Sequence, residues 1–323
     1  MDWYHATQPH HPHSRQYAAH TFQKACAYGH TAVVRDMLAR SGDHEVDVHA
    51  DDEAAFRVAC ANGHLDAVRA LLQRTGHRSI NVHILNEAAF CSACEHGHAH
   101  VVRELLALTQ ERTVDARIQN QWALNAACTQ GHLDVVRELL ALTGMREMNV
   151  HAGNDAAYRV ACEYGRLDVV RELLALTGAR TISAPMHTAV AFRWACARGR
   201  VDVVRELLAL SGDRRIAGPA GDDHALHSAT MYERIAVVRC LLELTDGRAP
   251  TFNAQAKDAP ACVQAACAWT ESIETWQRCR VMTTALCREV LDAVLLRARA
   301  LRWQRRARVT AAWRHAHHPS GSP

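Results

Sequence analysis

Residues 131–140 read Gly-His-Leu-Asp-Val-Val-Arg-Glu-Leu-Leu, and variants of this stretch recur every 34 residues without insertion or deletion. The recurrence is marked by an arginine that never changes, at Arg35, Arg69, Arg103, Arg137, Arg171, Arg205 and Arg239. It is also marked by a glycine, at Gly29, Gly63, Gly97, Gly131, Gly165 and Gly199, with Glu233 in the seventh place. A fixed period of this length predicts a solenoid, in which each repeat buries its apolar face only against its neighbours.

The first half of each repeat predicts a short helix. In residues 52–85, the apolar side chains that follow Asp52 have helical spacing, and Gly63 is expected to end the helix with a positive φ. Asp52 can accept hydrogen bonds from the free amides of the helix start, so it is the expected N-cap. The equivalent expected caps are Asn86, Asn120, Asn154, Thr188 and Asp222.

The second half predicts another helix and an extended loop. The helix is expected from Leu65 onward, with an ion pair between Asp66 and Arg69 on its surface and Gly76 at its end. Residues 80–83, Ile-Asn-Val-His, then read as a short extended segment before the next repeat. Each repeat is therefore predicted to be helix, turn, helix and extended loop.

The stretch at 131–140, together with Val46-Asp-Val-His-Ala50, resembles the ankyrin repeat over about 18–250. Tetratricopeptide repeats share the 34-residue period, but they lack the extended segment. Ala54-Ala-Phe-Arg57 departs from the ankyrin pattern, which has Thr-Pro-Leu-His there. The resemblance implies an all-α ankyrin-repeat solenoid of seven repeats with an extended β-turn loop in each repeat and a C-terminal helical cap. It also implies non-catalytic protein–protein recognition, as a scaffold or adaptor.

In ankyrin repeats, the loop tips and the exposed side of the first helix form a concave recognition surface. Here the residue before each repeat glycine varies along the chain, while its neighbours barely change. We call these residues, with Arg193 and Trp194 one turn earlier, the recognition strip: Tyr28, Asn62, His96, Gln130, Tyr164, Arg193, Trp194, Arg198 and Tyr232. Tyrosine, tryptophan and arginine dominate interface hot spots, so the strip is the predicted partner-binding surface. Random drift at an exposed position is the alternative explanation.

Six cysteines also follow the period, at Cys26, Cys60, Cys94, Cys128, Cys162 and Cys196. Packed helices lie about 8–10 Å apart, whereas a disulfide requires Cα atoms within about 7 Å, so neighbouring repeats cannot be bridged. The cysteines are therefore expected to be small buried side chains in a reducing compartment.

The repeat glycine is followed by His30, His64, His98 and His132. Histidines 34 residues apart lie on different repeats and cannot share one metal ion, so hydrogen bonding within each turn is their expected role. No phosphate loop, nucleophile elbow or paired-carboxylate site is present. The sequence accordingly predicts no enzyme, no metal site and no cofactor.

The two ends depart from the period. Residues 1–17 form a His-rich segment that is expected to be a disordered tail, and residues 251–280 are expected to be a degenerate repeat or cap. Residues 281–323 predict a basic amphipathic helix and tail. The arginines that give this segment its charge include Arg297, Arg299, Arg302, Arg305, Arg306 and Arg308. The helix either caps the solenoid with a solvated face or binds a polyanion, meaning nucleic acid or an anionic membrane.

The net charge of +3 is too small to predict nucleic-acid binding by itself. No signal peptide and no apolar run long enough to span a membrane is visible. We therefore expect a monomeric cytosolic protein with a protein partner. Nuclear location and use as an effector directed at a foreign host cell remain open alternatives.

Overall fold

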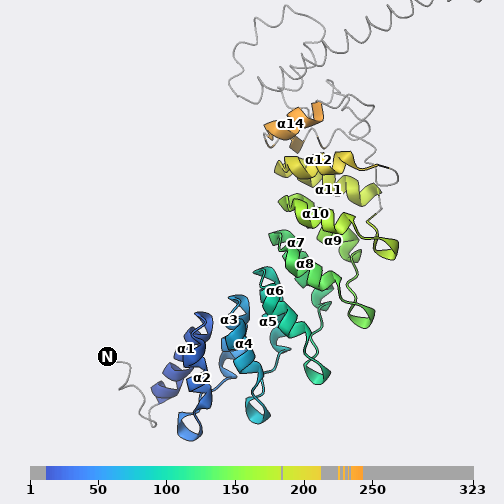
Figure 1. Ribbon diagram of the computed structural model, residues 1–323. Coiled ribbons are helices and arrows are strands. Elements are labelled where there is room, and N and C mark those ends of the chain that lie inside the picture. Colours follow the sequence, from blue (N-terminus) through green and yellow to red (C-terminus); the bar gives the residue numbers. More distant parts are fainter. Residues whose placement is uncertain are drawn as a thin grey trace, which may run out of the picture. The chain divides into compact units, whose positions relative to one another are not determined.

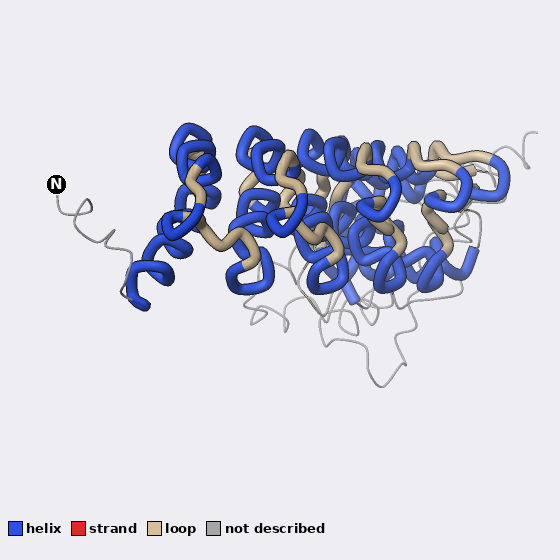
Figure 2. Tube along the Cα trace, turned by 90° about the horizontal axis from the view of Figure 1, so that it is seen from below, coloured by secondary structure: helices blue, strands red, loops and turns tan. Residues whose placement is uncertain are grey.

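The computed structural model describes residues 12–182, 185–211 and 234–242, together with Ala225, Ser228, Ala229 and Tyr232. These residues form helices and loops, with no strand among them (Figure 2). In the first six repeats the helices come in successive pairs, and the loops of the first repeats project from one side of the pairs (Figure 1). The described part is therefore all-α, as the sequence predicts.

The bounds of the elements follow the repeat. The first helices of the pairs are α1 (Pro12–Ala27), α3 (Ala50–Ala61), α5 (Ile84–Glu95), α7 (Ile118–Gln130), α9 (Ala152–Tyr164) and α11 (Pro185–Arg198). The second helices are α2 (Thr31–Ala39), α4 (Leu65–Leu72), α6 (Ala99–Leu106), α8 (Leu133–Leu140), α10 (Leu167–Leu174), α12 (Val201–Ala209) and α14 (Ile235–Leu242). The loops carry one 3-10 turn each, at Gly42–His44, Gly76–Arg78, Gln110–Arg112, Gly144–Arg146 and Gly178–Arg180.

The chain divides into two compact units. Unit 1 comprises Met1–Ala161 and Arg166–Ile182, and unit 2 comprises Cys162–Gly165 and Ser183–Pro323. In unit 1, first helices pack on first helices and second helices on second helices, as a solenoid requires. In unit 2, α11 packs on α12 and α12 on α14.

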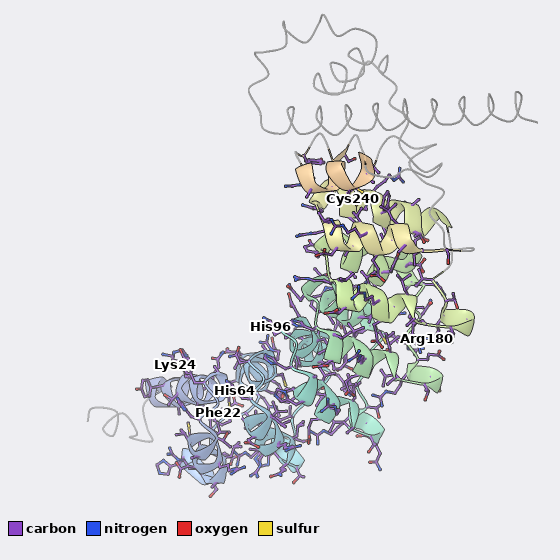
Figure 3. All side chains as sticks on the ribbon, turned by 45° about the horizontal axis from the view of Figure 1, so that its top comes forward. Phe22, Lys24, His64, His96, Arg180 and Cys240 are labelled. Carbon is purple, nitrogen blue, oxygen red and sulfur yellow. The ribbon has the colours of Figure 1, made fainter. Side chains whose placement is uncertain are left out.

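The core is built from the same positions in every described repeat. In α3 and α4, Phe56, Cys60, Val68 and Leu71 are completely buried. Burying a side chain of this size stabilises a fold by about 1.5–3 kcal/mol, and each repeat contributes several such side chains. Phe22, buried in α1, fills the position of Phe56 one repeat earlier (Figure 3).

The six periodic cysteines are all buried, and none of them is in a disulfide. Burial raises the pKa of the Cys26 thiol to about 12. It raises the pKa of Cys60 and Cys128 further still, because a thiolate would lose its hydration. The cysteines thus pack as neutral apolar groups, as predicted.

The predicted N-cap at Asp52 is wrong. Asp51, Asp52 and Glu53 form a left-handed turn with φ values of 53°, 56° and 59°, and the residue that precedes α3 is His49, whose side chain makes no cap hydrogen bond. A left-handed residue other than glycine costs about 1–2 kcal/mol, so this turn requires compensating contacts. Those contacts come from Glu53, as described below.

Three of the other expected caps are also wrong. Asn86 and Asn154 lie in the same left-handed turn of their repeats, and Thr188 lies inside α11. The side chain of Asn120 and the whole of Asp222 lie outside the described residues. The second helix also ends earlier than predicted, because α4 stops at Leu72 and Gly76 begins the 3-10 turn.

The predictions for the chain ends are reached only in part. Helix α1 begins at Pro12, so residues 12–17 of the expected tail are helical. The expected cap at 251–280 and the basic helix at 281–323, with all six of its named arginines, lie outside the described residues.

Candidate recognition surface

The turn between the two helices of a repeat depends on its glycine. Gly63 has a φ of +76° and Gly97 a φ of +80°, a region that glycine enters without strain. A Cβ atom on Gly63 would also come within 2.4 Å of Nδ1 of His98 from the next repeat. The glycine is therefore required both by the backbone and by the imidazole that lies against it.

The histidine after the repeat glycine joins consecutive repeats. Nε2 of His64 donates to the Ala27 carbonyl at 2.9 Å, and Nε2 of His98 donates to the Ala61 carbonyl at the same distance (Figure 3 labels His64). A carbonyl only accepts, so Nε2 carries the proton in each case. The prediction that these histidines bond within their own turn is wrong, because the acceptor lies on the preceding repeat. His132 repeats the contact, with the Glu95 carbonyl as acceptor.

Arginine takes over this position later in the chain. In unit 1, Nε of Arg166 donates to the Thr129 carbonyl at 2.8 Å. In unit 2, Nε of Arg200 donates to the Glu163 carbonyl and Nε of Arg234 to the Ala197 carbonyl, both at 3.1 Å. The hydrogen bond is the same as that made by histidine, but a guanidinium adds a permanent positive charge.

The imidazole of His98 in unit 1 adds less charge. Burial is the main cause that lowers the pKa of His98, and the neighbouring histidines His96, His100 and His132 lower it further, against a smaller opposing effect of its backbone hydrogen bond. His98 therefore stays neutral near pH 7. Its ring stacks on that of His96, with centroids 6.4 Å apart.

In unit 1 the recognition strip is mostly polar. Tyr28, Asn62, His96 and Gln130 are all exposed, as predicted for partner contacts. Two of them are already bonded to the backbone, because Nδ2 of Asn62 donates to the Ala27 carbonyl and Nδ1 of His96 donates to the Ser92 carbonyl. Tyr28 is the large apolar member of this group, and 69% of its surface is exposed.

In unit 2 the strip is aromatic and cationic. Tyr164, Trp194 and Tyr232 are 42%, 47% and 60% exposed, which is unusual for residues of this size. Arg198 is exposed and lies across Glu163, to which Nε and one terminal nitrogen donate at 3.1 and 2.8 Å. Arg193 is only half-buried. The structure thus places five predicted contact residues within unit 2.

The loops hold a cluster that the sequence prediction missed. Nδ1 of His49 lies 3.0 Å from Oε1 of Glu53, and its Nε2 donates to the His77 carbonyl at 2.8 Å. The same Glu53 oxygen accepts from the Asn81 amide at 2.8 Å, and Glu53 is almost completely buried. We call this arrangement the loop clamp, since it ties one loop to the loop of the next repeat.

The loop clamp recurs in two further repeats. His83 pairs with Glu87 at 2.7 Å and donates to the Glu111 carbonyl, and His151 pairs with Asp155 at 2.7 Å and donates to the Ala179 carbonyl. In each clamp the hydrogen bond to the carboxylate is the largest cause that raises the histidine pKa. Both ring nitrogens have acceptors, so the imidazolium is the favoured form.

The repeat between the second and third clamps replaces both members together. Arg117 stands where the three clamped repeats have histidine, and Gln121 stands where they have a carboxylate. The recurring spacing of histidine and acid, four residues apart at the loop–helix junction, is the sequence signal that could have revealed the clamps.

The second helices carry a different set of ion pairs. Arg69 pairs with Glu104 at 2.8 Å, so its main partner lies on the next repeat and not at Asp66 as predicted. The same pairing joins Arg103 to Glu138 and Arg137 to Glu172. Exposed pairs of this kind contribute about 0–1 kcal/mol each, but they neutralise that face.

Comparison with known families agrees with this geometry. A family model described as ankyrin repeats, in three copies, matches residues 22–116 and again residues 90–186, together more than half of the chain. The chain therefore belongs to the ankyrin-repeat family. No curated protein matches it.

Two further properties concern the described residues only. They contain no group of three or more histidine, cysteine, aspartate or glutamate side chains arranged to hold a metal ion. Every helix among them is too short or too polar to cross a bilayer. Ankyrin repeats generally mediate protein–protein interaction, which makes a protein the expected kind of partner.

Proposed function

We propose that this protein is a non-catalytic adaptor that binds a protein partner through the recognition strip, with most of the binding energy supplied by unit 2. The observation that carries the proposal is that Tyr164, Trp194 and Tyr232 are exposed in the unit that also exposes Arg198. Exposed aromatic side chains lose unfavourable hydration when a partner covers them, and they lose little conformational entropy.

The arginine of this group is prepared for binding. Two hydrogen bonds that Arg198 donates to Glu163 fix its guanidinium, so little further side-chain entropy is lost when a partner covers it. In unit 1, by contrast, the amide of Asn62 and the ring of His96 already bond to the backbone. Unit 1 is thus proposed to extend the contact and not to anchor it.

The test is partner capture with substitutions in the strip. Tyr164→Ala, Trp194→Ala and Tyr232→Ala are each expected to weaken capture of the partner by about 2 kcal/mol or more, as hot-spot residues do. Met145→Ala is the matched control, because Met145 is a large exposed apolar residue on a loop of unit 1 and lies outside the strip.

Each variant is first checked for an unchanged helical spectrum and melting temperature. If the three strip variants, correctly folded, retain the partner as well as Met145→Ala does, the proposed surface is wrong. Loss of the partner in all four variants would show that capture reflects general apolar exposure and would equally contradict the proposal.

A further inference from the structure

Two arginines of unit 2 each donate one hydrogen bond to the backbone and remain exposed at the surface. Arg200 and Arg234 donate through Nε to carbonyl groups at 3.1 Å, and both residues are exposed. Their methylene chains lie against repeat glycines, since a Cβ added to Gly165 would meet Cδ of Arg200 at 2.6 Å and one added to Gly199 would meet Cδ of Arg234 at 2.9 Å. The backbone bond uses only Nε, so the two terminal nitrogens of each guanidinium can donate to a ligand.

The charges around these arginines are unequal. Glu163 is paired with Arg198, so those two charges cancel. Asp202 lies in the first turn of α12, two residues after Arg200. Arg200 and Arg234 together exceed that remaining negative charge. The described part of the face is therefore complementary to an acidic ligand.

The distance between the two arginines sets the distance between the acidic groups of a ligand that contacts both. They occupy the same position in consecutive repeats, and packed helices lie about 8–10 Å apart. A peptide extended in the polyproline II conformation has three residues per turn and rises about 3.1 Å per residue, so its side chains three residues apart lie on one face and span about this distance. Trp194, on α11 of the repeat that contains Arg200, offers an exposed apolar surface in the same unit.

From these observations we infer that unit 2 binds an extended acidic peptide whose carboxylates are about three residues apart, with an apolar side chain between them that packs on Trp194. The inference rests on the proposed function, because it specifies the partner of the same surface. Each carboxylate accepts two hydrogen bonds from the terminal nitrogens of one guanidinium, an arrangement about twice as strong as a neutral hydrogen bond. A nucleic acid fits less well, because two exposed arginines can neutralise only a few phosphates, and Asp202 lies two residues from one of them.

The chain provides its own variant for the test. At the equivalent position in unit 1, His64 makes the same backbone hydrogen bond at 2.9 Å without a permanent charge. Arg200→His and Arg234→His should therefore keep the contact between repeats and remove the cation at pH 8. Arg205→Gln is the control, because Arg205 is an exposed arginine of the same unit on the second helix, and its substitution removes the same charge elsewhere.

The experiment measures fluorescence anisotropy of labelled peptides with the full-length protein at pH 8. One peptide has glutamate at every third residue with leucine between, a second has glutamine in place of glutamate, and a third has glutamate at every second residue. The first is expected to bind most tightly. Arg200→His and Arg234→His should each weaken it by roughly tenfold or more, while Arg205→Gln leaves it unchanged.

The inference is overturned if the glutamine peptide binds as well as the glutamate peptide, or if the histidine variants bind the acidic peptide like wild type. It is also overturned if an oligothymidylate binds more tightly than any peptide with the same dependence on Arg200 and Arg234. The proposed function fails separately, if the captured partner is retained by Tyr164→Ala, Trp194→Ala and Tyr232→Ala. If those three variants lose the partner while Arg200→His and Arg234→His retain it fully, the inference of an acidic peptide is contradicted and the proposed function stands.

Discussion

Units 1 and 2 use the same repeat but present different chemistry at equivalent positions. At the repeat position of His64, unit 1 also has the imidazoles of His98 and His132 and one guanidinium, Arg166, whereas unit 2 has only guanidiniums, at Arg200 and Arg234. Before the glycine, unit 1 has one tyrosine among polar residues, and unit 2 has Tyr164 and Tyr232. The loop clamps, by contrast, occur only in unit 1 among the described residues.

The difference shows which property of the repeat is constrained. Histidine and arginine both donate to a carbonyl of the preceding repeat, so the contact survives the exchange while the surface charge changes. The scaffold therefore tolerates either side chain, and the choice between them is available to set what the surface binds.

The largest effect is expected from opening a cavity in each unit separately. Leu139 of α8 and Leu207 of α12 occupy the same repeat position and are completely buried. Leu139→Ala and Leu207→Ala should each destabilise by about 2–5 kcal/mol. Stability in a solenoid is distributed over neighbouring repeats, so hydrogen exchange should accelerate mainly in the unit that carries the substitution. Equal acceleration throughout both units in either variant would show that they unfold as one.

The next effect comes from the repeat glycines, where the two units differ in what the new methyl group meets. Gly97→Ala places Cβ 2.4 Å from the stiff imidazole of His132, whereas Gly165→Ala meets the flexible Arg200 side chain at 2.6 Å. Both substitutions bear the cost of a positive φ, about 1–2 kcal/mol, and Gly97→Ala should cost more than that. Gly76→Ala is the control that bears only the cost of the positive φ, because nothing lies within 4 Å of a Cβ added there. Urea unfolding measures the free energy of unfolding of each variant. An equal loss of stability in all three variants would contradict the expected order.

The smallest effect is the pH dependence of the loop clamps, which should be confined to unit 1. The raised pKa values of His49, His83 and His151 mean that the folded state binds protons more tightly than the unfolded state. Their stabilisation is complete below about pH 6.5 and is lost as the pH rises through the raised values. The lowered pKa of His98 changes the stability with pH in the opposite direction. The effect of the clamps must therefore be measured by substitution in one clamp at a time.

Glu87→Gln isolates one clamp. It should lower the His83 pKa toward its ordinary value in an NMR titration and reduce the stability of unit 1 by less than about 1 kcal/mol at pH 6, with a smaller loss at pH 8. His83→Arg combined with Glu87→Gln copies the Arg117 and Gln121 repeat and should recover stability without the pH dependence. An unchanged His83 pKa in Glu87→Gln would show that the carboxylate is not the cause.

Much of this architecture is predictable from the sequence because it repeats. The helix pairs, the positive φ at Gly63 and the buried cysteines all follow from spacing and residue type. The exposure of the recognition strip also follows, although its role as a binding surface stays a prediction. The left-handed turn at Asp52 could not be predicted, since it depends on contacts between Glu53 and Asn81, 28 residues away. The acceptors of His64 and Arg69 were missed for the same reason, because each lies on a neighbouring repeat.

The most direct test of the central claim is hydrogen exchange of the full-length protein with and without its captured partner. If unit 2 is the binding surface, the partner should protect the segments around Tyr164 and residues 192–200. The equivalent turns at Asn62 and His96 in unit 1 should change less. Protection confined to unit 1, or to residues 297–308, with none around Trp194 would contradict the claim.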